Sequence, residues 1–393
     1  MSRAKRITPI EIQSVTQDRE GRSLAREDSG IGKDWAVLSD ELPSMDVPME
    51  ILAHRLHNGF QKSALPSAII IGVACVVLFT QDVVEAHTAG RVLATYCATM
   101  SVVMTSLLVY LHLTVYSDPL QQRRIVRILL MVPIYAVDSC IALWGHHLAS
   151  LIGLARDGYE SYVIYNFYHL LMGYLGGEEE ALRARGGVKM KHLPPLCFLP
   201  PFQLNRATIR LWRLLLVQYM FLKPTAALVA IMLHFGGAYD ETSWSFRDAH
   251  VYFVIILNIS VTCAFTSLVY FFFEFKDLLM PIKPIGKFAA VKAVVFLSFW
   301  QGVLMGLLVH FGFIQPSKQG LWTKEEVATG VQDFLICIEM LFMCYVHHLV
   351  FSESPYVPSL GHQPVRSWVI RHVLSISDVI EDSVSAVANI STT

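Results

Sequence analysis

The side chains best placed to do chemistry in this sequence are polar groups that lie inside long apolar segments. Five are ionisable and three are amides: Asp138, Glu160, Lys223, Asp333 and Glu339, with Asn166, Asn258 and Gln301. An ionisable group in hydrocarbon is costly, so it pairs with another group or faces a polar cavity. Pairing alone leaves a surplus, because Lys223 neutralises only one of the four carboxyl groups. The eight residues are therefore predicted to form a solute path or intramembrane polar network.

Asp333 and Glu339 are not expected to meet within that network. They are six residues apart, and at about 100° per residue they lie on different faces of one helix. Asp333 is also close to the predicted outer end of its segment. Packing is the alternative role for each polar residue, with the amides forming hydrogen bonds between helices.

Several kinds of chemistry lack their sequence signature. The chain has no G-x-x-x-x-G-K-[ST] phosphate loop and no H-E-x-x-H pair. The adjacent histidines His146–His147 and His347–His348 would point about 100° apart on a helix, which makes a poor chelate. We therefore expect no catalytic residue, no metal and no cofactor, and the protein is predicted not to be an enzyme.

The composition indicates which elements position these residues. Hydrophobic residues make up 54% of the chain and charged residues 16%, against about 25% charged in an ordinary soluble domain. The net charge of -1 gives no reason to expect a nucleic acid as partner. Such a chain is typical of an integral membrane protein, with membrane lipids as its surroundings.

Eight apolar segments are long enough, at about 20 residues each, to cross a membrane as helices. They are 66–84, 92–115, 125–148, 159–175, 212–235, 251–275, 288–313 and 330–350. The fourth segment is the shortest and holds Glu160 and Asn166, so a re-entrant or surface helix is its alternative. Residues 1–63 are polar and are predicted to be a disordered cytosolic arm, and residues 64–351 to be the transmembrane bundle.

The charge of the connectors predicts the orientation of the bundle. Lys and Arg gather in alternate connectors, with Arg156 alone in one of the poor ones and Lys276, Lys283, Lys287 and Lys292 in one of the rich ones. Because such residues accumulate on the cytoplasmic side, both termini are predicted to be cytosolic. Residues 352–393 form the cytosolic tail, in which apolar residues recur at helical spacing over 365–387. This amphipathic helix is expected either on the inner leaflet or against the protein's own cytosolic surface.

Four segments carry a resemblance to a known family: MVPIYAVDS at 131–139, YESYVIYNF at 159–167, FLSFWQG at 296–302 and QDFLICIEM at 332–340. In this order they resemble the organic solute transporter alpha superfamily, and its transmembrane protein 184 branch in particular. The resemblance implies an all-α fold with seven core transmembrane helices, preceded here by one N-terminal span. It also implies facilitated movement of organic solutes such as amphipathic anions, sterols or lipid-like molecules.

The resemblance bears on partners and modification as well. The family's alpha subunit works with a single-span beta subunit, so a beta-like subunit or a homo-oligomer is the expected assembly. Relatives carry a run of cysteines after a Pro-Pro pair, whereas this chain has Cys197 alone after Pro194-Pro195. Cys197 is thus the one candidate for lipidation at that site, and a plain loop thiol is the alternative.

Two functions remain open from the sequence. One is a facilitative carrier of organic solutes, although an anion carrier should present Lys or Arg along its path and the buried charges seen here are mostly acidic. The other is a membrane receptor or scaffold that binds a ligand or lipid and recruits cytosolic partners through its tail. The expected location is the plasma membrane or an endomembrane such as the vacuole or endosome.

Overall fold

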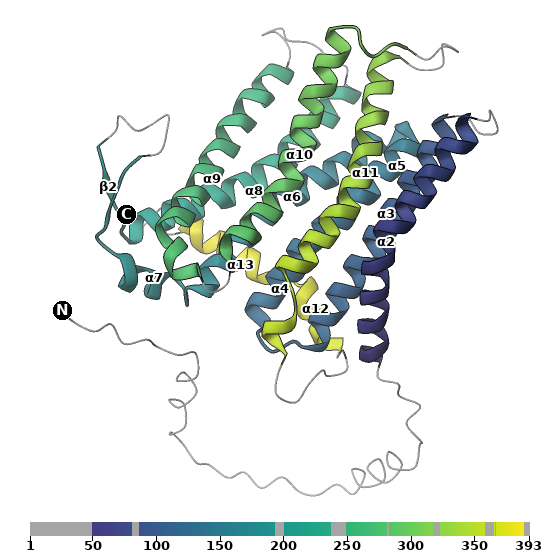
Figure 1. The fold of residues 1–393 in the computed structure, drawn as a ribbon. Coiled ribbons are helices and arrows are strands. Elements are labelled where there is room, and N and C mark those ends of the chain that lie inside the picture. Colours follow the sequence, from purple (N-terminus) through teal and green to yellow (C-terminus); the bar gives the residue numbers. More distant parts are fainter. Residues whose placement is uncertain are drawn as a thin grey trace, which may run out of the picture. The chain divides into compact units, whose positions relative to one another are not determined.

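The structure, a computed structural model, describes residues 49–80, 86–192, 200–236, 249–280, 283–316, 323–357, 365 and 367–388. In this part of the chain, long helices lie alongside one another as a bundle (Figure 1). The bundle helices are α2 (Met49–Thr80), α3 (Ala86–Thr114), α4 (Pro119–Leu129), α5 (Met131–Trp144), α6 (His146–Tyr174), α8 (Arg206–Phe235), α9 (Ala249–Leu279), α10 (Pro284–His310) and α11 (Lys324–Val350). The fold is an all-α polytopic bundle.

Short elements join or follow these helices. Helix α7 (Glu178–Arg185) and a two-stranded antiparallel pair, β1 (Lys189–Met190) with β2 (Phe202–Gln203), connect α6 to α8. A single turn, η2 (Ser354–Tyr356), follows α11, and the tail contains α12 (Ser367–Leu374) and α13 (Ser377–Ala388).

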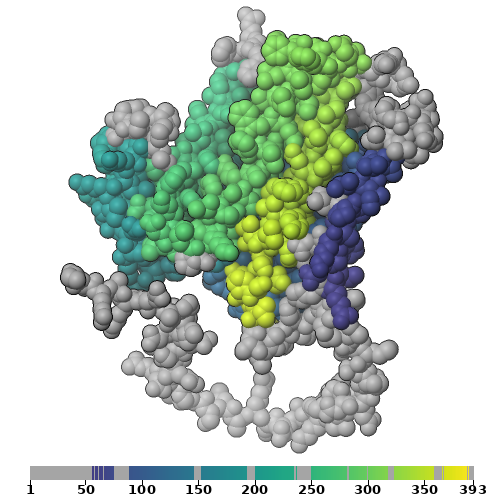
Figure 2. Space-filling view, in the orientation of Figure 1, coloured from purple at the N-terminus to yellow at the C-terminus, as the bar shows by residue number. Residues whose placement is uncertain are grey.

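Six helical segments of the described residues are long and apolar enough to cross a membrane. They are Thr88–Thr114, Pro119–Trp144, Arg206–Leu233, Ala249–Leu279, Pro284–His310 and Lys324–Tyr356. Large apolar side chains cover their outer surface, including Ile256 and Ile259 on α9 and Phe296 and Trp300 on α10. Figure 2 shows α10 and α11, green to yellow-green, side by side on one such face. Hydrocarbon solvates a surface of this kind, whereas in water it would associate.

Helix α6 is longer than the fourth predicted span. It has 29 residues and begins at His146 rather than near Tyr159. It falls outside the six apolar segments because Arg156, Asp157 and Glu160 lie close together on it and several tyrosines, Asn166 and His169 follow them. It nevertheless packs along both α5 and α8, so its charged residues are held between two apolar helices.

Helix α2 begins earlier than the predicted arm allows. The arm was expected to extend to Ser63, but the helix starts at Met49 and continues through Pro66. Phe60 and Ala64 pack into the hydrophobic core, and this burial favours helix where the polar composition alone predicts disorder. The rest of the predicted arm lies outside the described residues.

Proline and glycine shape the contacts around α5, α6 and α8. The third predicted span is divided at Leu130 into α4 and α5, next to Pro133, whose nitrogen has no hydrogen to donate to the carbonyl of Leu129. Helix α8 continues through Pro224. A Cβ atom on Gly158 would lie 3.2 Å from the Pro224 Cβ atom, so the glycine permits α6 and α8 to approach closely.

Aromatic side chains fill the core where α6, α8 and α9 meet. The rings of Trp212 and Tyr270 are stacked, and Phe271 packs edge-on against Tyr168 and Trp212. Trp212 is 3% exposed. It is thus a core residue, although it lies near the end of a predicted span.

The tail folds as two helices rather than one. The amphipathic segment predicted over 365–387 is interrupted at Ser375 and Ile376, between α12 and α13. The hydroxyls of Ser375 and Ser377 hydrogen-bond each other, and the Ser377 N–H donates to the Ser375 hydroxyl, so side chains compete with the helical pattern here. Helix α12 packs on α4 and α13 on α8, which supports the predicted contact with the protein's own surface.

Candidate functional site

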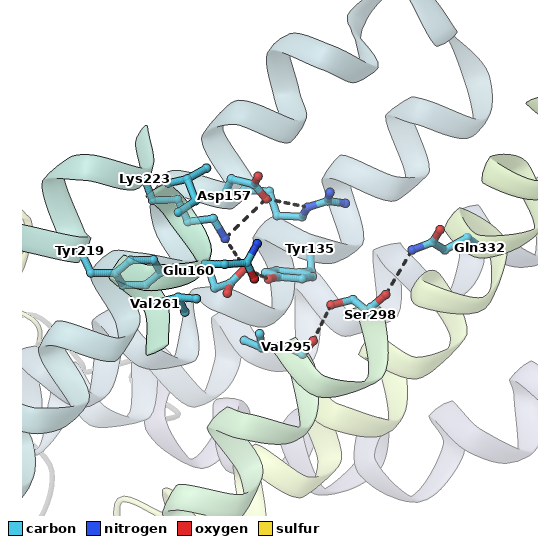
Figure 3. A pocket seen from close by; sticks show the side chains of 12 residues that line it. Tyr135, Asp157, Glu160, Tyr219, Lys223, Val261, Val295, Ser298 and Gln332 are labelled. Atoms are coloured by element: carbon cyan, nitrogen blue, oxygen red, sulfur yellow. Dashed lines mark hydrogen bonds and ion pairs between the residues drawn. The ribbon is translucent and has the colours of Figure 1, made fainter. Parts of the chain in front are cut away.

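A cavity of about 360 Å³ lies between α5, α6, α8, α9, α10 and α11 (Figure 3). Nine polar or charged residues line it: Tyr135, Arg156, Asp157, Glu160, Tyr219, Lys223, Asn258, Ser298 and Gln332. Leu257, Val261 and Val295 complete the wall. The cavity therefore offers hydrogen-bonding groups and an apolar surface to the same ligand.

The ion pair of Glu160 and Lys223 joins α6 to α8 at this cavity. The Lys223 Nζ atom lies 2.8 Å from Glu160 Oε2, and the Tyr135 hydroxyl donates to the same oxygen at 3.1 Å. Lys223 also lies 3.9 Å from the Asp157 carboxylate. Glu160 is the central residue of α6, so the pair sits about halfway along a helix of the bundle, where a solitary charge would be most costly.

A second ion pair, between Arg156 and Asp138, reduces the predicted surplus of carboxylates without removing it. The Arg156 guanidinium is 2.8 Å from Asp138 and 3.8 Å from Asp157, and it lies over the ring of Tyr135. Arg156 was predicted to lie in a connector, because the fourth span was expected to begin near Tyr159. Since α6 begins at His146, the arginine is within the bundle. We call Asp138, Arg156, Asp157, Glu160 and Lys223 the cavity cluster.

Amide and hydroxyl groups form the opposite wall. The Gln332 side chain donates to the carbonyl of Ser298 at 3.2 Å, joining α11 to α10. The Asn258 amide donates to the carbonyl of Val254 at 2.7 Å, within α9. Gln332, Ser298 and Tyr219 were absent from the predicted network. An amide or hydroxyl is common in membrane helices, and only the shared cavity distinguishes these three.

The remaining predicted residues lie elsewhere. Gln301 donates a hydrogen bond to Glu339 between α10 and α11, away from the lining of the cavity. Asp333 is 7% exposed, so it is buried rather than solvated at the end of its helix. Asn166 accepts from Arg127 at 3.3 Å near the tail. Thus the structure gathers Asp138, Glu160, Lys223 and Asn258 at the cavity and places Asp333 near Arg156 and Asp138 but outside the lining. Asn166, Gln301 and Glu339 lie apart from this group.

A second cluster of charged residues joins the tail to the bundle through ion pairs. Arg123 and Arg127 on α4 each lie 3.0 Å from the Asp378 carboxylate, and Arg213 on α8 lies 2.7 Å from Asp382. Tyr165 on α6 donates to Asp382 at 2.9 Å. We call Arg123, Arg127, Arg213, Asp378 and Asp382 the tail cluster.

The two aspartates of the tail cluster are held in their charged form. Burial would raise the pKa of Asp382, but the hydrogen bond with His169 and the charge of Arg213 lower it to about 2. Burial opposes the charge of Asp378 as well, and Arg127 and Arg123 lower its pKa below the usual value. Both carboxylates therefore remain ionised across the physiological range.

Cys197, the candidate for lipidation, lies outside the described residues. Among the described residues, no group of three or more His, Cys, Asp or Glu side chains is arranged to hold a metal ion.

Residues 90–356 match the family described as Organic solute transporter Ostalpha. This range covers more than half of the chain and contains all the helices that line the cavity. No solved structure matches the chain. With the family match extending over the cavity and the helices around it, the chain belongs to the organic solute transporter Ostalpha family.

Proposed function

We propose that the protein is a facilitative transporter that moves organic solutes across a membrane through the cavity between α5, α6 and α8–α11. The single observation that carries this proposal is the position of the cavity, beside the charged centre of α6 and within a membrane bundle. Transporters commonly place the solute site near the middle of the membrane. Here the cavity is lined by Glu160, the central residue of α6.

The chemistry of the lining supports an amphipathic solute. Tyr135, Asn258 and Gln332 offer hydrogen-bonding groups, while Leu257 and Val261 offer an apolar surface. Amphipathic anions, sterols and lipid-like molecules are the proposed classes. We place the chain in the transmembrane protein 184 branch, with seven core spans and one N-terminal span.

The same proposal includes an arrangement in the membrane. Both termini are cytosolic, so the tail cluster is on the cytosolic side. A single-span beta-like subunit or a second copy of the chain is the proposed partner. The membrane is the plasma membrane or an endomembrane such as the vacuole or endosome.

Flux in liposomes that contain the purified protein tests the proposal. The panel contains an amphipathic anion, a sterol and a lipid-like solute, with Lys223→Ala and Glu160→Gln as comparisons. We expect flux of at least one class with the wild-type protein and a loss of about tenfold or more in both variants. Absence of flux for every class, with a bundle that is folded by circular dichroism, would refute a transport function.

A receptor or scaffold function is the second candidate, and one observation favours it. Helices α12 and α13 bury one face but leave Leu374, Ile376, Ile380 and Val384 exposed. This stripe is available to bind a lipid surface or another protein. If removal of residues after Pro355 abolishes the cellular phenotype while flux in liposomes is unchanged, the scaffold function is favoured over transport.

A further inference from the structure

Lys292, which was predicted to lie in a cytosolic connector, is a charged residue of the bundle. It lies within α10, eight residues after Pro284, and its ammonium is 2.8 Å from the centroid of the Phe265 ring on α9. It also borders a second, small cavity of about 20 Å³ between α6, α9 and α10. Its amine is thus inside the bundle rather than in a loop.

Lys292 differs from the two cations of the cavity cluster in its partners. Lys223 has the Glu160 carboxylate at 2.8 Å and Arg156 has the Asp138 carboxylate at 2.8 Å. Among the residues that the structure describes, no carboxylate lies within 4.0 Å of the Lys292 amine, and its close contact is the face of a phenylalanine ring. In the described part of the bundle, Lys292 is therefore a cation without a carboxylate partner.

The contact with the Phe265 ring does not compensate for the removal of the Lys292 ammonium from water. The attraction of a cation to an aromatic ring is smaller than the cost of removing an ammonium from water, even after the protein relaxes. The small cavity beside it has room for about one water molecule. A negatively charged atom that enters this space would therefore meet an unsatisfied charge.

The small cavity adjoins the large one. Val295, one turn further along α10, lines both. The rings of Phe167, Phe265 and Phe288 line the small cavity, so the surroundings suit the apolar body of an amphiphile. A solute held in the large cavity can therefore direct a charged end past Val295 toward Lys292.

We propose that Lys292 is the specificity-determining residue that receives the negatively charged group of a solute, and that it selects charged over uncharged amphiphiles at this site. The inference rests on the proposed transport function, because it assumes that a solute occupies the adjoining cavity. Lys223 and Arg156 are excluded from this role by their carboxylate partners. The electrostatic requirement for a cation on the path of an anion is then met by a residue outside the predicted network.

The experiment compares two probes that share one apolar body, a sulfonate and an uncharged glucoside. Neither crosses a lipid bilayer unaided, so both report flux into liposomes. The variants are Lys292→Met, which keeps the length of the side chain, and Lys292→Arg, which keeps the charge. Lys287→Met is the matched control, because Lys287 is also on α10 over a phenylalanine ring but donates to the carbonyl of Val350 at 2.7 Å.

We expect Lys292→Met to lower sulfonate flux about tenfold or more, with glucoside flux within twofold of wild type. Lys292→Arg should restore most of the sulfonate flux, and Lys287→Met should leave both probes unchanged. Equal flux of the sulfonate in Lys292→Met and wild type would overturn the inference, and so would an equal loss of both probes.

Binding separates this inference from the transport proposal. The thermal stabilisation of the purified protein by the sulfonate is measured without any membrane gradient. If stabilisation requires Lys292 but no probe is transported, the residue binds the anion and the transport function is wrong. If the sulfonate stabilises wild type and Lys292→Met equally, or stabilises neither, the inference is wrong whatever the flux.

Discussion

The cavity cluster and the tail cluster each include a cation of α8, Lys223 in one and Arg213 in the other, but they differ in what fills the space beside their charges. In the cavity cluster, Lys223 and Glu160 form one wall of a space of about 360 Å³. In the tail cluster, the space is filled by α12 and α13, and Arg127 also donates to the carbonyl of Ser375. Ion pairs thus line a proposed binding site in the cavity cluster, and in the tail cluster they attach the tail to the bundle.

The family match sharpens this contrast. It extends over residues 90–356, which include the entire cavity cluster, while Asp378 and Asp382 lie beyond it. The comparison predicts that changes in the cavity cluster act on flux and changes in the tail cluster act on the position of the tail.

The largest effect is expected from separating the central ion pair. Lys223→Met leaves Glu160 buried without its lysine, which typically costs about 3–5 kcal/mol in stability. We expect a clear drop in the melting temperature of the purified protein and a loss of flux of tenfold or more.

The double variant Glu160→Gln with Lys223→Met is the control for this prediction. Neither charge remains, so the melting temperature should recover most of the loss while flux stays low. Recovery of flux in the double variant would show that the pair only supports the fold.

The next effect concerns the fastening of the tail. Asp378→Asn with Asp382→Asn leaves Arg123, Arg127 and Arg213 without carboxylates, at a cost of roughly 2 kcal/mol or more. Amide hydrogen exchange in 367–388 should increase by about tenfold or more, while flux stays within twofold of wild type. A loss of flux as large as that of Lys223→Met would remove the distinction between the two clusters.

Acid provides a milder way to loosen the tail. The pKa of Asp382 is lowered to about 2, against about 3.9 in an unfolded chain. Its contribution, roughly 2 kcal/mol, is therefore complete above about pH 4 and is lost as the pH falls through about 2. Hydrogen exchange of α13, corrected for the intrinsic effect of pH, should be unchanged from pH 7 to pH 5 and should rise only below about pH 4. Release of the tail near pH 6 would assign the fastening to another group.

The smallest effect is expected at the contact between α6 and α8. In Gly158→Ala the new Cβ atom would lie 3.2 Å from Pro224, so the two helices must separate slightly. The helix propensity of alanine offsets this by up to about 1 kcal/mol. We expect a nearly unchanged melting temperature and a two- to threefold change in flux. Since Gly153 has nothing within 4 Å of an added Cβ atom, Gly153→Ala is the control and should leave flux as it is.

Much of the fold follows from the sequence, because the length and apolarity of a membrane helix are local properties. Six of the predicted crossings reappear as long apolar helices. The start of α6 was missed because Gly153, Arg156, Asp157 and Gly158 resemble a connector when burial is unknown. In the structure, Asp138 and the ring of Tyr135 stabilise Arg156 from another helix, and no local pattern records such a contact.

The candidate site was predictable only in part for the same reason. The cost of a buried charge identified Asp138, Glu160 and Lys223, which the structure brings together. It does not say which helix faces which, so Gln301 and Glu339 were grouped with a site that they do not line. Lys292 was missed because a lysine near a span end is ordinarily placed at the membrane surface.

The tail cluster also limits how the bundle can move. Asp378 forms ion pairs with α4, and Asp382, one turn later on α13, forms one with α8. Because both aspartates lie on one short helix, α13 links α4 and α8 at a fixed distance. Any rearrangement that widens the end of the bundle next to α13 must move α4, α6 and α8 as a single body or first break the ion pairs with α13. Spin labels on the ends of α4 and α8 would accordingly keep one separation through a transport cycle, with the motion concentrated at the boundary with α10 and α11.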